Sequence, residues 1–418
     1  MSIAPWSRRP KTLAMILAGG EGRRIYPLTM HRAKPAVPFG GRYRTIDFVL
    51  NNFVNSGFFK IKILTQFKSD SLNKHLSNVW HMSRQIGHFV DAVPAQMRVG
   101  SQWYKGTADA VYQNLYIIEN ERPDVVAIFG ADHIYKMDIN QMLMSHLERD
   151  AEVTVAGIPV PIEQSKEYGV IEYDHDWQMI GFQEKPVIPC PMPDQPDQVM
   201  ASMGNYLFNT DVLVEELERD AERDDSEHDF GKNILTSIFK KHRTFVYNFN
   251  ENYVPGEESK TRGYWRDIGT IDAYWQANMD LVSVSPVFNL YNEQWPLRAE
   301  NLNQPAAKFV FADRDSKRIG IATDSLVSEG CIISGGHINQ SILFPKVKIN
   351  SYSYVHRSIL MHDVDVGRYA QIRNTIIDKN VRIPNEIRIG YDEEKDRERF
   401  IVSEGGVVVI SKGTRIEP

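Results

Sequence analysis

The last quarter of the chain carries a repeat that few folds can accommodate. Segments starting at Ser341, Ser358 and Thr375 share one pattern at 17-residue intervals, and DSLVSEGCIISGGHINQ stands one interval earlier, at Asp324. Within the units aliphatic residues recur about every six positions, at Leu343, Ile349 and Val355, then at Leu360, Val366 and Ile372. An ordinary antiparallel sheet would not require such fixed spacing. Three short strands per turn, with one shortened corner, predict a parallel β-helix of roughly four coils.

The first two thirds of the chain has a different rhythm, in which short apolar runs alternate with amphipathic segments. Buried strands are expected at 13–17 (LAMIL), 60–65 (KIKILT), 125–130 (VVAIFG) and 153–160 (VTVAGIPV). Helices are expected at 45–57, 107–121 and 139–150. This alternation predicts an α/β domain with a mostly parallel sheet covered on both faces.

A proline- and asparagine-rich stretch, SPVFNLYNEQWPLRAENLNQP, separates the two patterns. A chain of 418 residues exceeds one ordinary core, which fits more than one domain. We therefore expect a first domain at 1–285, a linker at 286–310 and a β-helix domain at 311–418.

Charge and cysteine usage narrow the class of protein. The net charge of −6 and the pI near 6.1 argue against a nucleic-acid binder. Cys190 and Cys331 are the two cysteines and neither lies in a CxxC motif, so we expect neither a disulfide framework nor a zinc site, and a cytoplasmic setting. No run approaches the roughly 18 apolar residues of a membrane span, so no membrane partner is expected.

The stretch LAGGEGRRIYPLT, from Leu17 to Thr29, follows the first predicted strand. It lacks the GxxxxGK[ST] motif, and Ile25 stands where GxGxxG requires its third glycine. Gly19 and Gly20 would let the backbone approach a phosphate, and Arg24 can add a charge-assisted hydrogen bond. A tight turn with surface arginines is the alternative.

A second cationic segment follows, HRAKPAVPFGGRYRTIDF. It contains Arg32, Lys34, Arg42 and Arg44, stiffened by prolines and glycines. Two cationic loops suit a polyphosphate better than a single phosphate.

Two aspartates are candidate metal ligands. Asp132, in FGADHIYKMD, directly follows a predicted strand, and ligands gather at the carboxyl ends of strands in open α/β sheets. Asp267, in YWRDIGTIDAYWQA, has a similar context. Carboxylates suit Mg²⁺ together with phosphate oxygens, whereas helix N-capping is the alternative for each.

Other polar residues have equally open interpretations. Lys185, beside Glu184 in GFQEKPV, suits a sugar phosphate, and Glu184 could accept bonds from sugar hydroxyls. The alternative is a surface ion pair. Trp103 and Tyr104 precede a Gly-Thr helix start, where aromatic rings stack on a ligand or, more commonly, pack in the core.

The segments LAGGEGRRIYPLT and RAKPAVPFGG closely resemble the start of sugar-nucleotide pyrophosphorylases. WYKGTADAV, FGADHIYKMD, EYGVI, FQEKP, SMGNYLF, HDFGKNIL and YWRDIGTIDAYWQANMDL resemble the glucose-1-phosphate adenylyltransferase family in order and spacing, and DRERFIVSEGGVVVISKG resembles its C-terminus. The resemblance covers nearly the whole chain. It implies a Rossmann-like nucleotidyltransferase domain followed by a left-handed parallel β-helix, and a homotetramer.

The resemblance also implies roles for individual residues. It implies catalytic roles for Arg24, Asp132, Lys185 and Asp267, with Mg²⁺ held by the two aspartates. The ATP site would comprise Leu17, Ala18, Gly19, Gly20, Arg24, Lys34, Gln66, Gly106 and Thr107. Glucose 1-phosphate would be surrounded by Tyr104, Gly169, Glu184, Lys185, Ser202, Asp229 and Trp265.

The reaction implied is attack by the glucose 1-phosphate oxygen on the α-phosphorus of ATP, with release of pyrophosphate. Family members respond to phosphorylated or carboxylate metabolites, and Arg32, Arg44, Lys379 and Arg415 are the cationic positions implied for that site. Gln66 and Trp103 match positions that couple it to catalysis. His31 and Pro38 depart from some relatives, which leaves the effector's identity open.

Three alternatives remain at this point. The enzyme could use another nucleotide, as UDP- or dTDP-glucose pyrophosphorylases do, or the chain could be a regulatory subunit without activity. The β-helix could also be an acyltransferase domain, with His337, His356 and His362 as candidate residues. We expect these histidines to be exposed corner residues instead.

Overall fold

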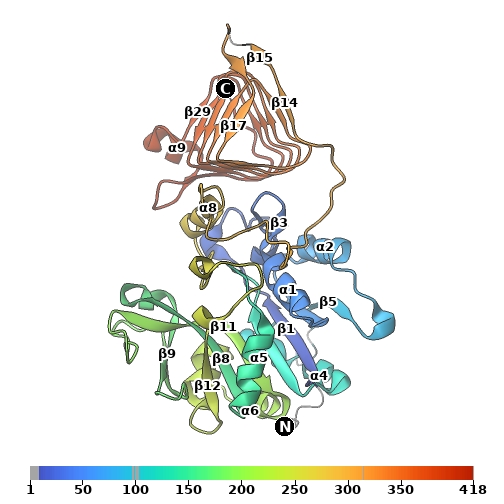
Figure 1. The fold of residues 1–418 in the computed structure, drawn as a ribbon, viewed down its shortest axis with the longest axis vertical. Helices are drawn as coiled ribbons and strands as arrows, with labels where there is room; N and C mark the ends of the chain where they lie inside the picture. The colour runs from blue at the N-terminus through green and yellow to red at the C-terminus, as the bar shows by residue number, and fades with distance from the viewer. Residues whose placement is uncertain (1–8, 97, 99–102, 314, 418) are drawn as a thin grey trace.

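The computed structural model describes residues 9–96, 98, 103–313 and 315–417. Figure 1 shows an α/β unit in the lower half and a prism of short strands above it. No helix in these ranges is long and apolar enough to cross a membrane.

The α/β unit is built on one nine-stranded sheet. Seven strands follow the order β10-β9-β11-β6-β1-β4-β5, and β8 pairs with β11 and β12. The strands β6, β1, β4 and β5 run parallel, as predicted, whereas β11 runs antiparallel to β6, β8 and β9. The bounds are β1 (Thr12–Ala18), β4 (Lys60–Thr65), β5 (Phe89–Pro94), β6 (Val125–Gly130), β8 (Val153–Pro161), β9 (Gly169–Tyr173), β10 (Met179–Glu184), β11 (Gln198–Asn209) and β12 (Thr244–Asn248).

Helices cover both faces of this sheet, which follows from the alternation of side chains along β1. Ala14 and Ile16 join the core under α1 and α5, whereas Leu13 and Met15 join the core under α3, α4 and α6. The expected helix at 107–121 is divided in two, α3 and α4. The helix bounds are α1 (Thr45–Asn55), α2 (Asp70–Val79), α3 (Thr107–Tyr112), α4 (Leu115–Glu121), α5 (Ile139–Glu148), α6 (Thr210–Ala221), α7 (Leu235–Ile238) and α8 (Ile271–Asp280).

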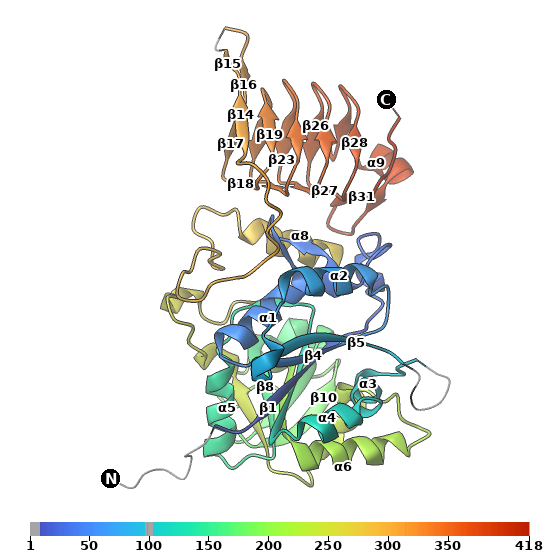
Figure 2. The ribbon, with the colours of Figure 1, turned by 90° about the vertical axis from the view of Figure 1, so that its right-hand side faces the viewer.

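The prism is a parallel β-helix with three sheets (Figure 2). They are β14-β19-β22-β25-β28, β17-β20-β23-β26-β29 and β18-β21-β24-β27-β31-β30. The first coil comprises β14 (Lys308–Val310), β17 (Ile321–Thr323) and β18 (Leu326–Val327), and β28 (Arg382–Ile383), β29 (Arg388–Ile389) and β31 (Val408–Ile410) complete the last. The prediction of roughly four coils is one too low, because the inserted hairpin β15–β16 (Ala312–Asp313, Arg318–Ile319) hides the repeat in the first coil.

The coils between bear the remaining strands and share the predicted period. Their bounds are β19 (Ile332–Ser334), β20 (His337–Asn339), β21 (Ile342–Leu343), β22 (Lys348–Ile349), β23 (Tyr354–His356), β24 (Ile359–Leu360), β25 (Asp365–Val366), β26 (Gln371–Arg373) and β27 (Thr375–Ile377). Helix α9 (Glu393–Arg399) and β30 (Ile401–Val402) interrupt the last coil.

The earliest repeat interval is shorter than predicted. Ile342 pairs with Ile359 at the expected spacing of 17, but Leu326 pairs with Ile342, a spacing of 16. The missing residue lies at the corner containing Gly335 and Gly336. A Cβ on Gly336 would lie 2.6 Å from Ile349 Cγ2, so glycine permits the tighter corner.

A residue with left-handed backbone conformation recurs at the same corner of the later coils. Lys346, Asp363 and Asn380 have φ of 66°, 60° and 61°, each 17 residues after the last. Because L-residues adopt this conformation only at a cost, its periodic return indicates that the stacked coils impose it.

The two units share a hydrophobic core. On the sheet that faces the α/β unit, Ile359 and Ile376 point outward against residues such as Leu28 and Phe39, while Leu360 and Ile377 point into the prism. Both faces of this sheet are therefore buried, which fixes the prism against the α/β unit.

The segment between α8 and β14 lies along α1. Asn51 Nδ2 donates to Arg298 O at 3.0 Å, Arg298 N donates to Asn51 Oδ1 at 2.8 Å, and Asn55 Nδ2 donates to Pro296 O at 3.0 Å. The connection is thus held by side chains of the first helix.

Candidate active site

A cleft of about 830 Å³ opens at the carboxyl ends of β1, β4 and β6. This is where open α/β sheets bind ligands. The cleft is lined by 17 of the predicted residues: Leu17, Ala18, Gly19, Gly20, Arg24, Lys34, Gln66, Tyr104, Gly106, Thr107, Asp132, Gly169, Glu184, Ser202, Asp229, Trp265 and Asp267. Lys185 is the one residue predicted for catalysis or substrate binding that does not line the cleft.

The glycine loop after β1 is open toward the cleft. A Cβ on Gly20 would meet no atom within 4 Å, so protein packing does not explain the glycine. Gly22 has φ of 64°, and its carbonyl accepts a hydrogen bond from Thr29 Oγ1 at 2.9 Å. Arg24 Nη2 lies 3.1 Å from where a Gly269 Cβ would stand, which places the guanidinium beside the segment of Asp267.

A lysine bridges the two candidate metal ligands. Lys34 Nζ donates to Asp132 Oδ2 at 2.9 Å and to Asp267 Oδ1 at 3.3 Å. Burial alone would lower the pKa of Lys34, yet the two carboxylates raise it. Burial opposes charge on Asp132, but Lys34 and then His133 hold the pKa of that carboxyl well below its usual range. The Lys34 ammonium therefore places a positive charge between the carboxylates of Asp132 and Asp267.

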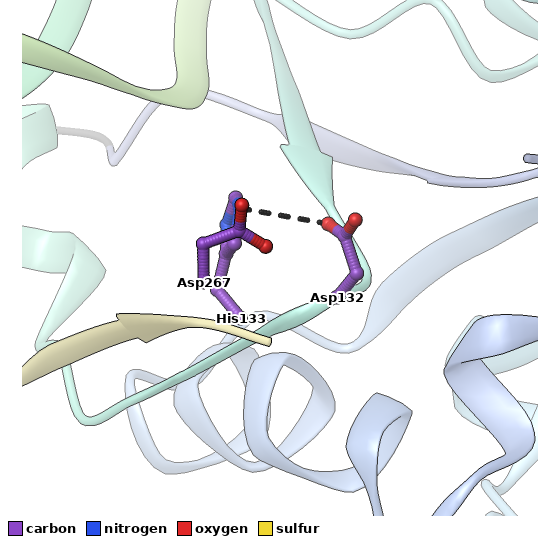
Figure 3. A group of neighbouring side chains, drawn as sticks. All are labelled: Asp132, His133 and Asp267. Atoms are coloured by element: carbon purple, nitrogen blue, oxygen red, sulfur yellow. Dashed lines mark ion pairs between the residues drawn. The ribbon is translucent and has the colours of Figure 1, made fainter. Parts of the chain in front are cut away.

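His133 completes this group, and the sequence offered no separate prediction for it. Donor atoms of Asp132, His133 and Asp267 all lie within 4.8 Å of one another, and Figure 3 shows the three side chains converging. The strand β7 (His133–Tyr135) pairs with β13 (Trp265–Asp267). Carboxylates plus imidazole form a donor set that fits a divalent cation.

Two hydrogen bonds join Gln66, which follows β4, to the backbone of Tyr104. Tyr104 N donates to Gln66 Oε1 at 2.8 Å, and Gln66 Nε2 donates to Tyr104 O at 3.4 Å. The Trp103 side chain is exposed and does not line the cleft. Gln66 thus fixes the backbone beside the cleft, while Trp103 packs neither in the core nor in the cleft.

Gly106 and Thr107 have packing roles that the sequence did not reveal. A Cβ on Gly106 would lie 2.3 Å from His228 O, so the glycine allows two backbone segments to touch. Thr107 Oγ1 donates to Asp229 Oδ2 at 2.9 Å and accepts from Phe230 N at 3.0 Å. These contacts place Asp229 at the cleft wall.

The far end of the cleft contains Glu184. Its Oε2 lies 3.1 Å from where a Cβ of Gly169 or of Gly231 would stand, so both backbones approach the carboxylate closely. Burial, and the nearby charge of Asp229, raise the pKa of Glu184. The neighbouring Lys185 has φ of 48°, and its half-exposed ammonium lies 3.8 Å from Glu184 Oε1.

Three of the four predicted effector residues meet between the two units. Arg32 Nη2 donates to both carboxylate oxygens of Asp378, at 2.9 and 3.0 Å, and both side chains are buried. Arg44 Nη1 donates to Ser71 O and Oγ. Burial, then Arg44 and Arg32, lower the pKa of Lys379 to about 7.

A fourth positive charge, that of Lys412, completes what we call the interdomain cluster: Arg32, Arg44, Lys379 and Lys412. Lys412 adds to the depression of the Lys379 pKa. Among the described residues, no contact joins Arg415 to the cluster. The backbone of Arg415 instead forms an isolated parallel β-bridge with that of Arg382. The sequence did not signal Lys412, because only the path of the last coil brings it to Lys379.

The expectation that three β-helix histidines are exposed is wrong for two of them. His337 is exposed, but His356 and His362 are half-buried. Burial, then Lys379 and Arg44, lower the pKa of His362 to about 3. His362 lies against the interdomain cluster rather than at an open corner, because its coil faces the catalytic unit.

The fold and this cleft define a nucleotidyl transferase. Residues 13–284 match the nucleotidyl transferase family, and residues 305–410 match the GlmU-like C-terminal hexapeptide family. The second match agrees with the predicted left-handed parallel β-helix. Members of the nucleotidyl transferase family generally use a divalent metal.

Full-length relatives narrow the family. A glucose-1-phosphate adenylyltransferase of Anaeromyxobacter sp. (strain Fw109-5) is 58% identical over 409 residues, which cover 98% of this chain and 100% of the relative. Those of Thermus thermophilus and Corynebacterium jeikeium are 52% and 48% identical, covering 97% of this chain and 99% and 98% of the relatives. The chain belongs to the glucose-1-phosphate adenylyltransferase family.

Proposed function

We propose that this chain transfers the adenylyl group of ATP to α-D-glucose 1-phosphate, giving ADP-glucose and pyrophosphate for α-glucan (glycogen) synthesis. The observation that carries the proposal is the pair Asp132 and Asp267 on either side of Lys34, beside an open glycine loop. The names of the relatives select the adenylyl donor and the glucose 1-phosphate acceptor.

The triphosphate would lie along Gly19 and Gly20, with Arg24 and Lys34 supplying positive charge. Backbone N–H groups freed of side chains can point at phosphate oxygens, as in other anion-binding loops. Gln66 would lie near the base, held there by its two hydrogen bonds to Tyr104.

The sugar phosphate would occupy the opposite end. Glu184, kept close to the backbone by Gly169, offers acceptor oxygens to sugar hydroxyls. Ser202, Asp229, Tyr104 and Trp265 complete that wall. Lys185 would contact the phosphate only if its half-exposed side chain turns into the cleft.

The phosphate oxygen of glucose 1-phosphate forms a bond to the α-phosphorus of ATP while the bond to the bridging oxygen of pyrophosphate breaks. The nucleophile is already an anion, so no side chain needs to remove a proton. Positioning and charge neutralisation therefore account for catalysis by this chain.

Asp132 and Asp267 would hold Mg²⁺, whose chemistry here is the screening of phosphate charge during in-line displacement. The same two carboxylates hold Lys34 in the structure. With Asp132 and Asp267 holding the cation, the Lys34 ammonium would be free to contact the phosphates.

The interdomain cluster is proposed as the site of a phosphorylated or carboxylate effector. Arg44 and Lys379 supply positive charge that Asp378 alone, already paired with Arg32, does not balance. Arg415, which the family resemblance implies, is proposed for the same site. A homotetramer and a cytoplasmic location remain proposals from the family.

A pyrophosphate-release assay tests the reaction, with glucose 1-phosphate and each of ATP, UTP, dTTP, CTP and GTP. We expect release with ATP well above that with the other nucleotides. A strong preference for UTP or dTTP would overturn the assignment. No release with any nucleotide would favour a regulatory subunit instead.

The variant Lys185→Ala tests a predicted site residue that does not line the cleft. We expect a higher KM for glucose 1-phosphate with a smaller change in kcat, since a charge that holds the ground-state phosphate is lost. Steady-state kinetics measure both values, and an unchanged KM would remove Lys185 from the site.

A further inference from the structure

The backbone fixes His133 beside one of the two candidate metal ligands. In the antiparallel pair β7 and β13, His133 and Asp267 are directly opposite one another. Such cross-strand partners point to the same face, with Cβ atoms about 5 Å apart. Asp132 lies just before β7, and its carboxylate comes within 4.8 Å of the donor atoms of the other two side chains (Figure 3).

The His133 imidazole is also held in place, although it forms no hydrogen bond within the described part of the chain. Its Nε2 lies 3.6 Å from Asp132 Oδ1, longer than a hydrogen bond, and its buried Nδ1 has no hydrogen-bond partner in the described part of the chain. The Trp265 ring packs against it at a centroid distance of 5.0 Å. Nε2 forms no hydrogen bond to a described residue, faces Asp132, and is the nitrogen that a cation between the carboxylates would reach.

We infer that His133 is a third protein ligand of the divalent cation and strengthens the binding of Mn²⁺ or Co²⁺ more than that of Mg²⁺. Oxygen donors alone suit Mg²⁺, whereas imidazole nitrogen favours the later first-row metals, whose affinity for such sites rises in the order Mn²⁺, Fe²⁺, Co²⁺. The inference rests on the proposed function in one respect, the presence of a cation at Asp132 and Asp267.

The arrangement of donors supports a single bound ion. All donor–donor separations are within 4.8 Å, so modest closure brings the atoms to about 2 Å from one centre. The Lys34 ammonium already occupies a cationic position between the carboxylates. A metal ion that replaces it there would leave Nε2 of His133 as the nearest nitrogen donor of the cluster.

The test measures Mn²⁺ binding by the electron paramagnetic resonance signal of free Mn²⁺, in the full chain without nucleotide. His133→Gln supplies an oxygen at similar reach, and His133→Leu supplies no donor. We expect both to weaken Mn²⁺ binding roughly tenfold or more, a size that even outer-shell changes can reach. Mg²⁺ affinity, measured by competition, should change less than about threefold in His133→Gln. The exposed His175→Gln is the matched control and should bind Mn²⁺ as the parent does.

Electron spin-echo measurements give a second result that does not depend on a folded variant. Mn²⁺ bound to the unmodified chain should show coupling to a directly bound nitrogen, and ¹⁵N-labelled histidine should change that coupling. Absence of any histidine nitrogen coupling, or unchanged Mn²⁺ affinity in folded His133→Leu, would overturn the inference.

Asp132→Asn separates this inference from the proposed function. If Asp132→Asn abolishes Mn²⁺ binding and His133→Leu does not weaken it, the metal site stands and the role of His133 fails. If neither substitution affects Mn²⁺ binding, the cation site itself fails, and the inference fails with it.

Discussion

The cleft and the interdomain cluster both gather charged side chains, but they balance them in opposite ways. In the cleft, Lys34 lies between Asp132 and Asp267, and its pKa is raised. Between the domains, Lys379 lies near Arg44 and Arg32, and its pKa falls to about 7. The same side-chain type therefore lies in two environments, one in which acids balance its charge and one in which other cations oppose it.

The difference shows that charge count alone does not define either site. Each region contains several ionisable groups, but only the cleft pairs its lysine with two acids. In the interdomain cluster the buried acid Asp378 forms its ion pair with Arg32, and the acids Glu300 and Asp47 act on Arg44 against a larger effect of burial. The following predictions, from the largest expected effect to the smallest, would break or sharpen this contrast.

Arg32→Met should destabilise the protein by about 3–5 kcal/mol, because it leaves Asp378 charged and buried without its partner. The double variant Arg32→Met/Asp378→Leu should recover most of that loss, since no unpaired charge remains. Urea unfolding measures the free energies. If the single variant is as stable as the parent chain, Arg32 acts on ligands alone and the pairing has no structural role.

Asp132→Asn should lower kcat roughly 10²-fold or more while changing KM for glucose 1-phosphate little. A metal ligand contributes several kcal/mol to stabilising charge in the transition state, and the amide no longer supplies a full negative charge. Steady-state pyrophosphate release checks it. A large rise in KM with an intact kcat would instead make Asp132 a sugar-phosphate ligand.

Gly106→Ala and Gly20→Ala form a matched pair within the cleft. Gly106→Ala should lose about 1–3 kcal/mol of stability, because its Cβ would press on His228 O. Gly20→Ala meets no protein atom, so stability should hold while the KM for ATP rises. Thermal unfolding and kinetics separate the two. Equal stability losses would show that the loop glycine is structural.

Lys379→Met should change the pH dependence more than the basal stability. The unfolded chain keeps the Lys379 proton up to its ordinary pKa of 10.5, whereas the folded chain releases it above about 7. Unfolding therefore takes up a proton between these values, and stability rises with pH across that window. Urea unfolding from pH 6 to 10 should show the slope in the parent chain and a smaller slope in Lys379→Met.

The affinity for an anion at Lys379 should depend on pH in the direction opposite to that of the folding stability. A bound anion favours the protonated ammonium, so affinity for sulfate, whose own charge is constant in this range, should fall at the interdomain cluster as the pH rises through about 7. Calorimetry of the parent chain and Lys379→Met distinguishes binding at the interdomain cluster from binding in the cleft, where Lys34 lies between two acids. An identical pH dependence in both proteins would contradict the contrast.

Much of the fold could be predicted because its signals are local. The strands β4 and β6 coincide with predicted runs, and the 17-residue spacing gave the register of the middle coils. The first coil was missed where a hairpin and a shortened corner break the period. Most predicted cleft residues could be named from the family resemblance, although the roles of Gly106 and Thr107 in packing could not.

Sequence alone determined the two kinds of architecture and the position of the glycine loop, because hydrophobic period and glycine content act between near neighbours. Only the tertiary structure decided which charges meet. His133 faces Asp267 through a strand register that joins distant segments, and Lys379 meets Arg44 through the docking of a β-helix face. Coordination and pKa depend on distance in space, which the order of residues does not state.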